Sequence, residues 1–368
     1  GALQSSDLIK LRHSSASVSP LAPVRRVFFL VPGTTDRYRC GGLSVALHTA
    51  RLVNRLMPTD LVTYRNRQDD YLFLDDLLQE EPAPGETLWV VSWGFEVPKL
   101  LRRLRGRHVI YHAHSSGYGF DLPSGVPVFA VSRNTLGYWG DRAPRNPLFL
   151  VPNALEPHWL ERGARLGAAV AEAGDRSIDV LVQERKSSRY VLGQLVPALR
   201  KLGLKVVVQS GWVEDLVALF NASKVYLYDS AEYWRSNGLS EGFGLPPLEA
   251  MACGCVVFSS FNHALADTLD PSVVGHQIGC GSLAWDVRRI CESVREPAAW
   301  RPTQERLNQL LSEHTETALM SRWRSALAAI ETMPSDEVPL RRSPTFMLRF
   351  NRKVGRILRL LGRLISRR

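Results

Sequence analysis

The stretch SEGFGLPPLEAMACGCVVFS, residues 240–259, decides the fold expected for this chain. It follows the β-rich run KVYLY at 224–228, and its glycines mark a loop before Pro247. Proline suits the first turn of a helix, where a missing amide hydrogen costs nothing, so a helix is predicted over 247–254. Small residues at the end of that helix let it lie close to a strand at 255–259. This order of strand, loop, helix and strand is typical of a parallel α/β sheet.

The same stretch also indicates a ligand site. A glycine-flanked loop that enters a helix offers free backbone N–H groups and the positive end of the helix dipole, which together favour phosphate. Glu241 lies in the loop, and Glu249, eight positions later, falls in the first turn of the predicted helix. The alternative is purely structural, because a glutamate there is often a capping partner and Gly-Pro loops are common.

Short β-rich runs alternate with helical ones along most of the chain, which predicts parallel sheets covered by helices. The first series of predicted strands covers 26–31, 61–64, 88–92, 108–114, 127–132 and 148–152. The second series covers 178–183, 205–210, 224–230 and 255–260, with helices near 189–202, 213–222, 247–254 and 284–295. No strand pattern occurs over 153–177, so two doubly wound, Rossmann-like halves are expected to face each other across a cleft.

Length and composition agree with this organisation. A chain of 368 residues suggests two domains and an appendage, expected here as 1–155, 156–332 and 333–368. The five cysteines form no C-x-x-C pair, so neither a disulfide framework nor a structural zinc site is indicated. The first apolar run, at 27–31, is too short for a secretory or membrane-spanning segment. We therefore expect a cytoplasmic protein.

The formal net charge of +10 is concentrated at the end of the chain. Residues 341–368 carry ten Lys and Arg side chains and no acidic one, so the preceding 340 residues are formally neutral. Apolar residues recur there at helical spacing: Phe346, Phe350, Val354, Ile357, Leu358, Leu361, Leu364 and Ile365. A basic amphipathic helix of this kind favours a membrane surface. The alternatives are a core-packing helix with a solvated arginine face and a nucleic-acid contact, of which the second does not need the apolar stripe.

The segment EGFGLPPLEAMACG, at 241–254, resembles the retaining GT-B glycosyltransferases that carry an E-x7-E motif (glycosyltransferase group 1, family 4-like). The resemblance implies two Rossmann-like domains and a nucleotide-diphosphate sugar as donor. It also implies that Glu249 holds the ribose hydroxyls and that Glu241 lies beside the transferred sugar. The backbone of Gly242, Phe243 and Gly244 would meet the donor, the last two at the diphosphate, with Leu245 as a further donor of a hydrogen bond.

Other segments match this family less specifically. Gly41 and Gly42 resemble its N-terminal Gly-Gly loop near the diphosphate and the acceptor, although a plain turn explains such a pair equally well. In YHAHSS, at 111–116, the resemblance favours His114 over His112 as the histidine that reaches the sugar or acceptor, and the alternative is an ordinary polar strand end. Asn153, in VPNAL, is expected to be structural.

The chain departs from the family after the first strand of its second half. The family has an arginine followed five residues later by a lysine, and both cations meet the diphosphate. Here Arg185 is in place, but the fifth residue after it is Tyr190. Lys186 or Arg189 is expected to substitute, since the leaving diphosphate needs a fixed positive charge. A solvated basic loop is the alternative.

The predicted function is that of a retaining, metal-independent glycosyltransferase. There is no D-x-D motif, and the doublets Asp69-Asp70 and Asp75-Asp76 are expected on a helical polar face, so neither a metal nor another cofactor is indicated. The basic tail suggests a glycan or lipid-linked acceptor at the inner membrane face, as in bacterial surface polysaccharide assembly. Another GT-B enzyme, such as an epimerase or phosphorylase, and a non-catalytic nucleotide-sugar scaffold remain alternatives. Donor specificity is expected from a loop at 229–240, whose sequence does not identify the sugar or the base.

Overall fold

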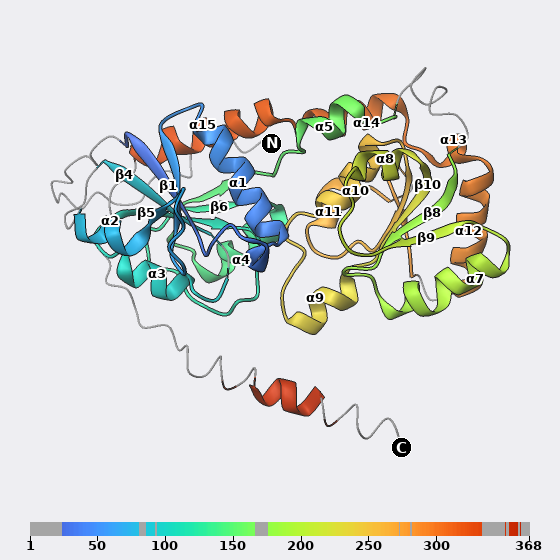
Figure 1. The fold of residues 1–368 in the computed structure, drawn as a ribbon, viewed down its shortest axis with the longest axis horizontal. Coiled ribbons are helices and arrows are strands. Elements are labelled where there is room, and N and C mark those ends of the chain that lie inside the picture. The colour runs from blue at the N-terminus through green and yellow to red at the C-terminus, as the bar shows by residue number, and fades with distance from the viewer. Residues whose placement is uncertain are drawn as a thin grey trace, which may run out of the picture.

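The protein is described by a computed structural model over residues 24–80, 86–92, 94–165, 176–271, 273–279, 282–332, 350, 353–359 and 361. Within these residues two parallel sheets form two α/β units that lie side by side (Figure 1).

The first unit contains a seven-stranded parallel sheet in the order β3-β2-β1-β4-β5-β6-β7. Its strands are β1 Arg26–Val31, β2 Thr59–Thr63, β3 Leu72–Phe73, β4 Thr87–Ser92, β5 His108–Ala113, β6 Val128–Ala130 and β7 Leu148–Leu150. The sheet is covered by α1 Gly41–Val53, α2 Leu74–Glu80, α3 Val97–Arg103 and α4 Arg133–Arg142. The central strands β1 and β4 are buried on both faces, as their continuous apolar sequences require.

The second unit contains a five-stranded parallel sheet in the order β12-β11-β10-β8-β9. Its strands are β8 Ile178–Gln183, β9 Val206–Gln209, β10 Ser223–Tyr228, β11 Val256–Ser259 and β12 His276–Gln277. Its helices are α7 Val196–Lys201, which continues a π-helical turn over Val191–Leu195, α8 Leu216–Asn221, α9 Ala231–Asn237, α10 Leu245–Ala252, α11 Leu265–Thr268, α12 Leu283–Arg295, α13 Pro297–Trp300 and α14 Gln304–Ser312. Helix α5, Pro157–Arg162, follows the connection from the first unit.

The expected fold class is confirmed, because all ten predicted strands are present, two of them (β1 and β8) with the predicted ends and the others with shifted ends. Two differences concern short edge strands, β3 and β12, which have two residues each and so carry no readable pattern. A third difference is α9, which lies where the sequence predicts a loop. None of the side chains of α9 is fully buried, so the helix has no apolar stripe for a sequence pattern to reveal.

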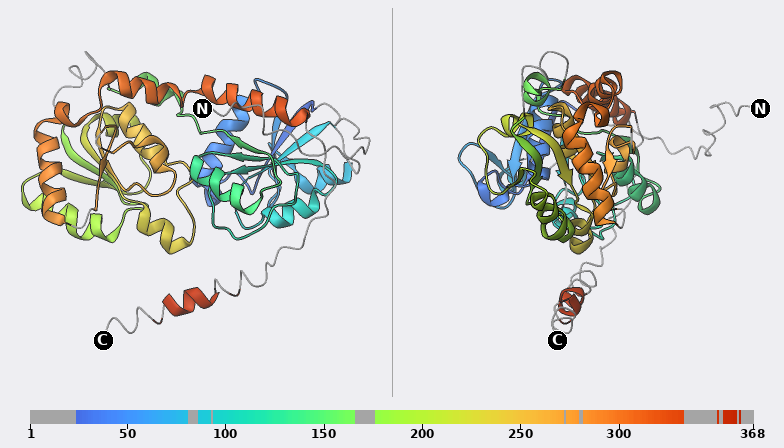
Figure 2. Two further views of the ribbon diagram at one scale, coloured as in Figure 1. Left: turned by 180° about the vertical axis from the view of Figure 1, so that it is seen from behind. Right: turned by 90° about the vertical axis from the view of Figure 1, so that its right-hand side faces the viewer.

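The last long helix, α15 Glu316–Glu331, returns from the second unit and packs on the first (Figure 2). Its Trp323 is fully buried, and the centroid of its ring lies 5.7 Å from that of Phe29 and 4.8 Å from that of Phe129. Leu319, Leu327 and Ile330 of α15 belong to the same apolar cluster. The sequence boundary at 155/156 assigned this helix to the second domain, whereas its packing places it in the core of the first.

Beyond Thr332, which follows α15, the structure describes residues 350, 353–359 and 361, and all of them are helical. The side chains of Phe350, Ile357, Leu358 and Leu361 are exposed, and Arg359 donates a hydrogen bond to the carbonyl oxygen of Ser236 at the end of α9. The remaining residues of the predicted basic helix, including 341–349 and 362–368, lie outside the described residues. Among the described helices, none is both long and apolar enough to cross a bilayer.

Candidate functional site between the two units

The two units touch where the loop after β5 meets the loop after α9. The hydroxyl of Ser115 donates to the carbonyl oxygen of Ser240 at 2.7 Å, and the backbone N–H of Ser116 donates to the hydroxyl of Ser240 at 3.0 Å. A Cβ atom at Gly242 would lie 1.4 Å from the carbonyl oxygen of His114, so only glycine permits this approach. Residues next to Glu241 therefore form the interface with the first unit.

Glu241 is buried at the carboxyl end of β10 and is tightly held. Its Oε2 accepts three hydrogen bonds of 2.7 Å, from the hydroxyl of Tyr228, the hydroxyl of Ser230 and the indole N–H of Trp234. Burial and the charge of Glu241 raise the pKa of Tyr228 well above its usual range, so its hydroxyl stays a donor. No described residue donates to Oε1, the second carboxylate oxygen. The carboxylate is thus fixed through one oxygen and leaves the other available.

The helix after this loop begins earlier than predicted, at Leu245 rather than at residue 247. Gly244 precedes it in the left-handed region, with φ 85°, and a Cβ there would lie 2.4 Å from the side chain of Leu265. Because Pro246 and Pro247 occupy the second and third helical positions, two of the usual free N–H groups are missing. The N–H groups left at this terminus belong to Phe243, Gly244 and Leu245, the residues expected to meet the diphosphate.

Glu249 is consequently the fifth residue of α10, in its second turn and not in its first. Its side chain is half-buried, and no described residue donates a hydrogen bond to it. Burial, together with the nearby charge of Glu156, raises the pKa of this carboxyl from 4.5 to about 7. A carboxylate in such surroundings lacks the donors that would stabilise its charge.

The three expected cations lie in different surroundings. Arg185 is exposed after β8. The side chain of Arg189 is 91% exposed and pairs with Glu232 of α9 at 2.6 Å. Lys186 is half-buried, and its ammonium lies 4.8 Å from the centre of the Trp234 ring. Burial lowers the pKa of Lys186, while the charge of Glu241 opposes that shift, so the lysine and the buried carboxylate interact electrostatically.

The predicted residues of the first unit lie at the carboxyl edge of its sheet. Gly41 and Gly42 are the first two residues of α1, and Gly41 is exposed. Burial lowers the pKa of His114 to about 3, so its imidazole is neutral near pH 7. Its ring centroid is 4.1 Å from that of His112, which packs against Trp323 of α15. Asn153 is buried; its backbone carbonyl oxygen is 3.2 Å from Nδ1 of His314, and its side-chain Oδ1 has no hydrogen-bond partner among the described residues.

The sequence predicted that both aspartate doublets lie on a helical polar face, and this prediction is wrong for one of them. Asp75 and Asp76 lie in the first turn of α2 and form ion pairs with Arg103 and Arg67, respectively, but Asp69 and Asp70 lie in a turn before β3. Within the described residues, one group of side chains is close enough together to hold a metal ion: His48, Glu156 and Glu316. There Nε2 of His48 is 2.7 Å from Glu316, and Arg51 donates to Glu156 at 2.9 Å, so each carboxylate already has a protein partner.

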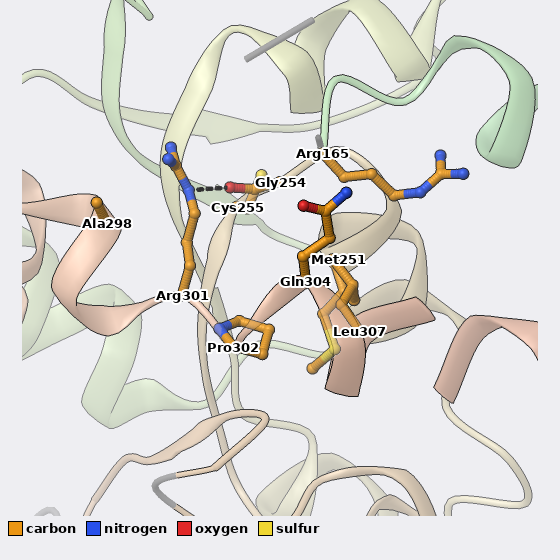
Figure 3. Close-up of a pocket in the computed structure, with 9 residues that line it drawn as sticks. All are labelled: Arg165, Met251, Gly254, Cys255, Ala298, Arg301, Pro302, Gln304 and Leu307. Carbon is orange, nitrogen blue, oxygen red and sulfur yellow. Dashed lines mark hydrogen bonds between the residues drawn. The ribbon is translucent and has the colours of Figure 1, made fainter. Parts of the chain in front are cut away.

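A cavity of about 190 Å³ lies in the second unit, but at the opposite edge of its sheet (Figure 3). Gly254 and Cys255, which line it, precede β11, whereas the glutamate loop follows the carboxyl end of β10. Arg301 donates to the carbonyl oxygen of Gly254 at 2.7 Å in its wall. None of the residues expected from the sequence to bind the donor lines this cavity.

Sequence analysis missed the residues that hold Glu241. Tyr228 was assigned only to a strand, and Ser230 and Trp234 fell in the expected specificity loop. Ser230 and Trp234 are four residues apart, so α9 brings them to the same side, where both donate to the carboxylate of Glu241. The signal in the sequence was a polar and an aromatic residue shortly after a strand end, which is too common to identify partners by itself.

Two Rossmann-like units, each built on a parallel sheet, define a GT-B architecture. The two glutamates, the lysine and the start of α10 lie near the junction of these units. Residues 196–305 match the family of glycosyl transferases group 1, so this segment of the chain carries a group 1 glycosyltransferase sequence.

Comparison with solved structures agrees with the fold. A glycosyltransferase from Rickettsia africae superposes with a TM-score of 0.58 at 10% identity, over 83% of this chain and 98% of the other. The sucrose-phosphate synthase of Thermosynechococcus elongatus gives 0.57 at 15% identity, over 83% and 100%. HepE from Anabaena, in complex with UDP-glucose, gives 0.57 at 13% identity, over 83% and 99%.

A sequence relative is the serotype-specific mannosyltransferase WbdA of Escherichia coli. It is 37% identical over 81 residues, which are 22% of this chain and 8% of the relative. The match therefore concerns a small part of the relative, and similarity outside that part is not implied.

Proposed function

We propose that this protein is a retaining glycosyltransferase that moves a sugar from a nucleotide-diphosphate sugar to a hydroxyl of a glycan or lipid-linked acceptor. The observation that carries the proposal is the arrangement of two glutamates, eight residues apart, at the loop and helix that follow β10. One is fixed, the other accepts no hydrogen bond from a described residue, and both lie in the segment that matches group 1 glycosyltransferases.

Each residue has a role that follows from its surroundings. The unpartnered carboxylate of Glu249 would accept hydrogen bonds from the ribose hydroxyls, which replace the missing protein donors. The N–H groups of Phe243, Gly244 and Leu245 and the ammonium of Lys186 would hold the diphosphate, with Arg185 and the α1 terminus at Gly41 and Gly42 nearby. Glu241 would present its free Oε1 to the transferred sugar.

The transfer step needs no group beyond these. The oxygen of the acceptor hydroxyl would bond to the anomeric carbon on the face from which the diphosphate leaves. The bond between the anomeric carbon and the phosphate oxygen breaks, and the hydroxyl proton passes to that leaving oxygen. Lys186 and the backbone N–H groups would stabilise the negative charge that collects there, without a metal ion. His114, neutral through burial, could contribute a hydrogen bond to sugar or acceptor but not a positive charge.

A donor panel tests this proposal. The names of the relatives make nucleotide-activated mannose and UDP-glucose the first two donors to try, followed by other uridine, thymidine, guanosine and adenosine diphosphate sugars. We expect one donor to raise the melting temperature, because a ligand at about 100 times its Kd stabilises by roughly 2.7 kcal/mol. That donor should also release its nucleoside diphosphate slowly. Donor binding without release under any acceptor would instead support a non-catalytic scaffold.

The basic tail supports a place at a membrane surface, and with it a lipid-linked acceptor in surface polysaccharide assembly at the cytoplasmic face. The described helical residues 353–359 expose Ile357 and Leu358 alongside Lys353, Arg356 and Arg359. Exposed apolar side chains flanked by positive charge suit an anionic bilayer. Deletion of 341–368 should abolish sedimentation with vesicles that contain anionic lipid. Unchanged sedimentation would contradict the membrane part of the proposal alone.

A further inference from the structure

We infer that Trp234 of α9 is a positioning residue that fixes Glu241 and Lys186 together. The inference rests on the proposed function, because it concerns the same carboxylate and cation. It depends on two contacts made by one side chain: the indole N–H donates to Oε2 of Glu241 at 2.7 Å, and the ring face lies 4.8 Å from the ammonium of Lys186.

The first contact restricts the carboxylate. An indole N–H is a donor only, so the oxygen that receives it must be an acceptor, as an ionised carboxylate is. The other two donors to Oε2 are Tyr228, the last residue of β10, and Ser230, which caps the start of α9. Trp234 comes from α9 and is therefore the one donor of the three that belongs to the helix outside the sheet. Without it, the carboxylate could turn about its remaining bonds.

The second contact restricts the cation. Lys186 adopts φ 68°, in the left-handed region that non-glycine residues seldom occupy, so its backbone is held there by its surroundings. A flexible four-carbon side chain needs a further contact to fix its ammonium. The ring of Trp234 supplies one as a cation–π interaction. The same indole thus sets the distance between the negative charge beside the sugar and the positive charge meant for the diphosphate.

Helix α9 is itself held toward this site. Arg189, three residues beyond Lys186, pairs with Glu232 of α9 through both its side chain and its backbone N–H. The C-cap of α9, Gly238, touches the first unit, where a Cβ at Gly117 would lie 2.4 Å from its carbonyl oxygen. A change in the contact between the units can therefore move Trp234, and through it both charged groups.

The test separates the two contacts. Trp234→Phe keeps a ring under Lys186 but removes the N–H, so we expect kcat to fall about tenfold to hundredfold while the Kd for the product nucleoside diphosphate stays within about threefold. Trp234→Leu removes both contacts, so the same fall in kcat should come with a Kd raised by roughly threefold to tenfold. Tyr233→Phe, on the same helix, is the matched control and should behave as the wild type.

Several results would overturn the inference. A wild-type kcat in Trp234→Phe would show that the N–H does not position Glu241, and equal Kd values for the Phe and Leu variants would remove the link to Lys186. If the wild type turned over no donor, the proposed function would fail. A double-mutant cycle measured by urea unfolding would still test whether Trp234 and Glu241 interact. The changes in unfolding midpoint of Trp234→Phe and Glu241→Gln should then be non-additive, and strict additivity would contradict the pairing.

Discussion

Glu241 and Glu249 lie eight residues apart, yet the protein surrounds the two carboxylates in opposite ways. Glu241 is buried with three donors on one oxygen, and Glu249 is half-buried with none from the described residues. The first carboxylate is a fixed part of the folded protein, whereas the second has a raised pKa and, in the proposed function, would gain its partners from the donor. Burial alone therefore does not indicate what a charged residue does, and its hydrogen-bond partners must be known.

The largest expected effect is that of Glu241→Ala. The change would leave the hydroxyls of Tyr228 and Ser230 and the indole of Trp234 without an acceptor, so we expect a loss of about 3 kcal/mol in the free energy of unfolding. Transfer should fall by at least about 10³-fold, because an electrostatic group next to the reacting sugar is removed. Urea unfolding and initial rates measure the two effects. A variant as stable as the wild type would contradict the closed hydrogen-bond arrangement.

Gly242→Ala tests whether the contact between the units fixes Glu241. The new Cβ would lie 1.4 Å from the carbonyl oxygen of His114, so the loop or the whole unit must move. We expect kcat to fall by about 100-fold, since reacting groups displaced by an ångström lose their alignment. Gly137→Ala is the control, because a Cβ there meets nothing within 4 Å and the residue lies in α4. Comparable rates for the two variants would show that the contact is not needed for turnover.

Glu249→Gln should change the pH dependence of stability rather than stability at low pH. The pKa of Glu249 is about 7 in the folded protein and near 4.5 when unfolded. Between these two pH values the folded state holds a proton that the unfolded state has lost. The contribution of the neutral carboxyl group to the free energy of unfolding is therefore complete below about pH 4.5 and is lost as the pH rises through 7. Relative to the glutamine variant, the wild type should lose about 3 kcal/mol of unfolding free energy over that range. Parallel pH profiles for the two proteins would show that Glu249 has partners after all.

The smallest expected effects distinguish the cations beside the two glutamates. Lys186→Met should weaken binding of a nucleoside diphosphate about tenfold, because a half-buried ammonium is lost next to Glu241. Arg189→Ala should change it by less than about twofold, since that side chain is exposed and its ion pair with Glu232 contributes little. Titration calorimetry measures both. A greater loss for Arg189→Ala would reverse the assignment of the phosphate-binding cation.

Much of this arrangement could be predicted because it depends on local patterns. The buried runs of β1 and β4 are continuous and apolar, and the order of such β-rich runs along the chain predicted parallel sheets. The spacing of Glu241, the glycines and Glu249 located the candidate site within one loop and helix. The start of α10 was misplaced by two residues, because Pro247 was taken as the first helical residue, whereas proline is tolerated throughout the first turn.

The sequence by itself determined two α/β units and the position of an acidic, glycine-rich loop before a helix, because strand and helix periods and proline geometry are properties of neighbouring residues. Only the tertiary structure decided that Trp234 reaches Glu241, that α15 completes the first unit, and that Lys186 rather than Arg189 packs on Trp234 beside the carboxylate. The contacts of Trp234 depend on how α9 packs within the second unit, and that of α15 on the return of the chain to the first. Contacts between residues distant in the chain are set by packing, and packing leaves no periodic signal in the sequence.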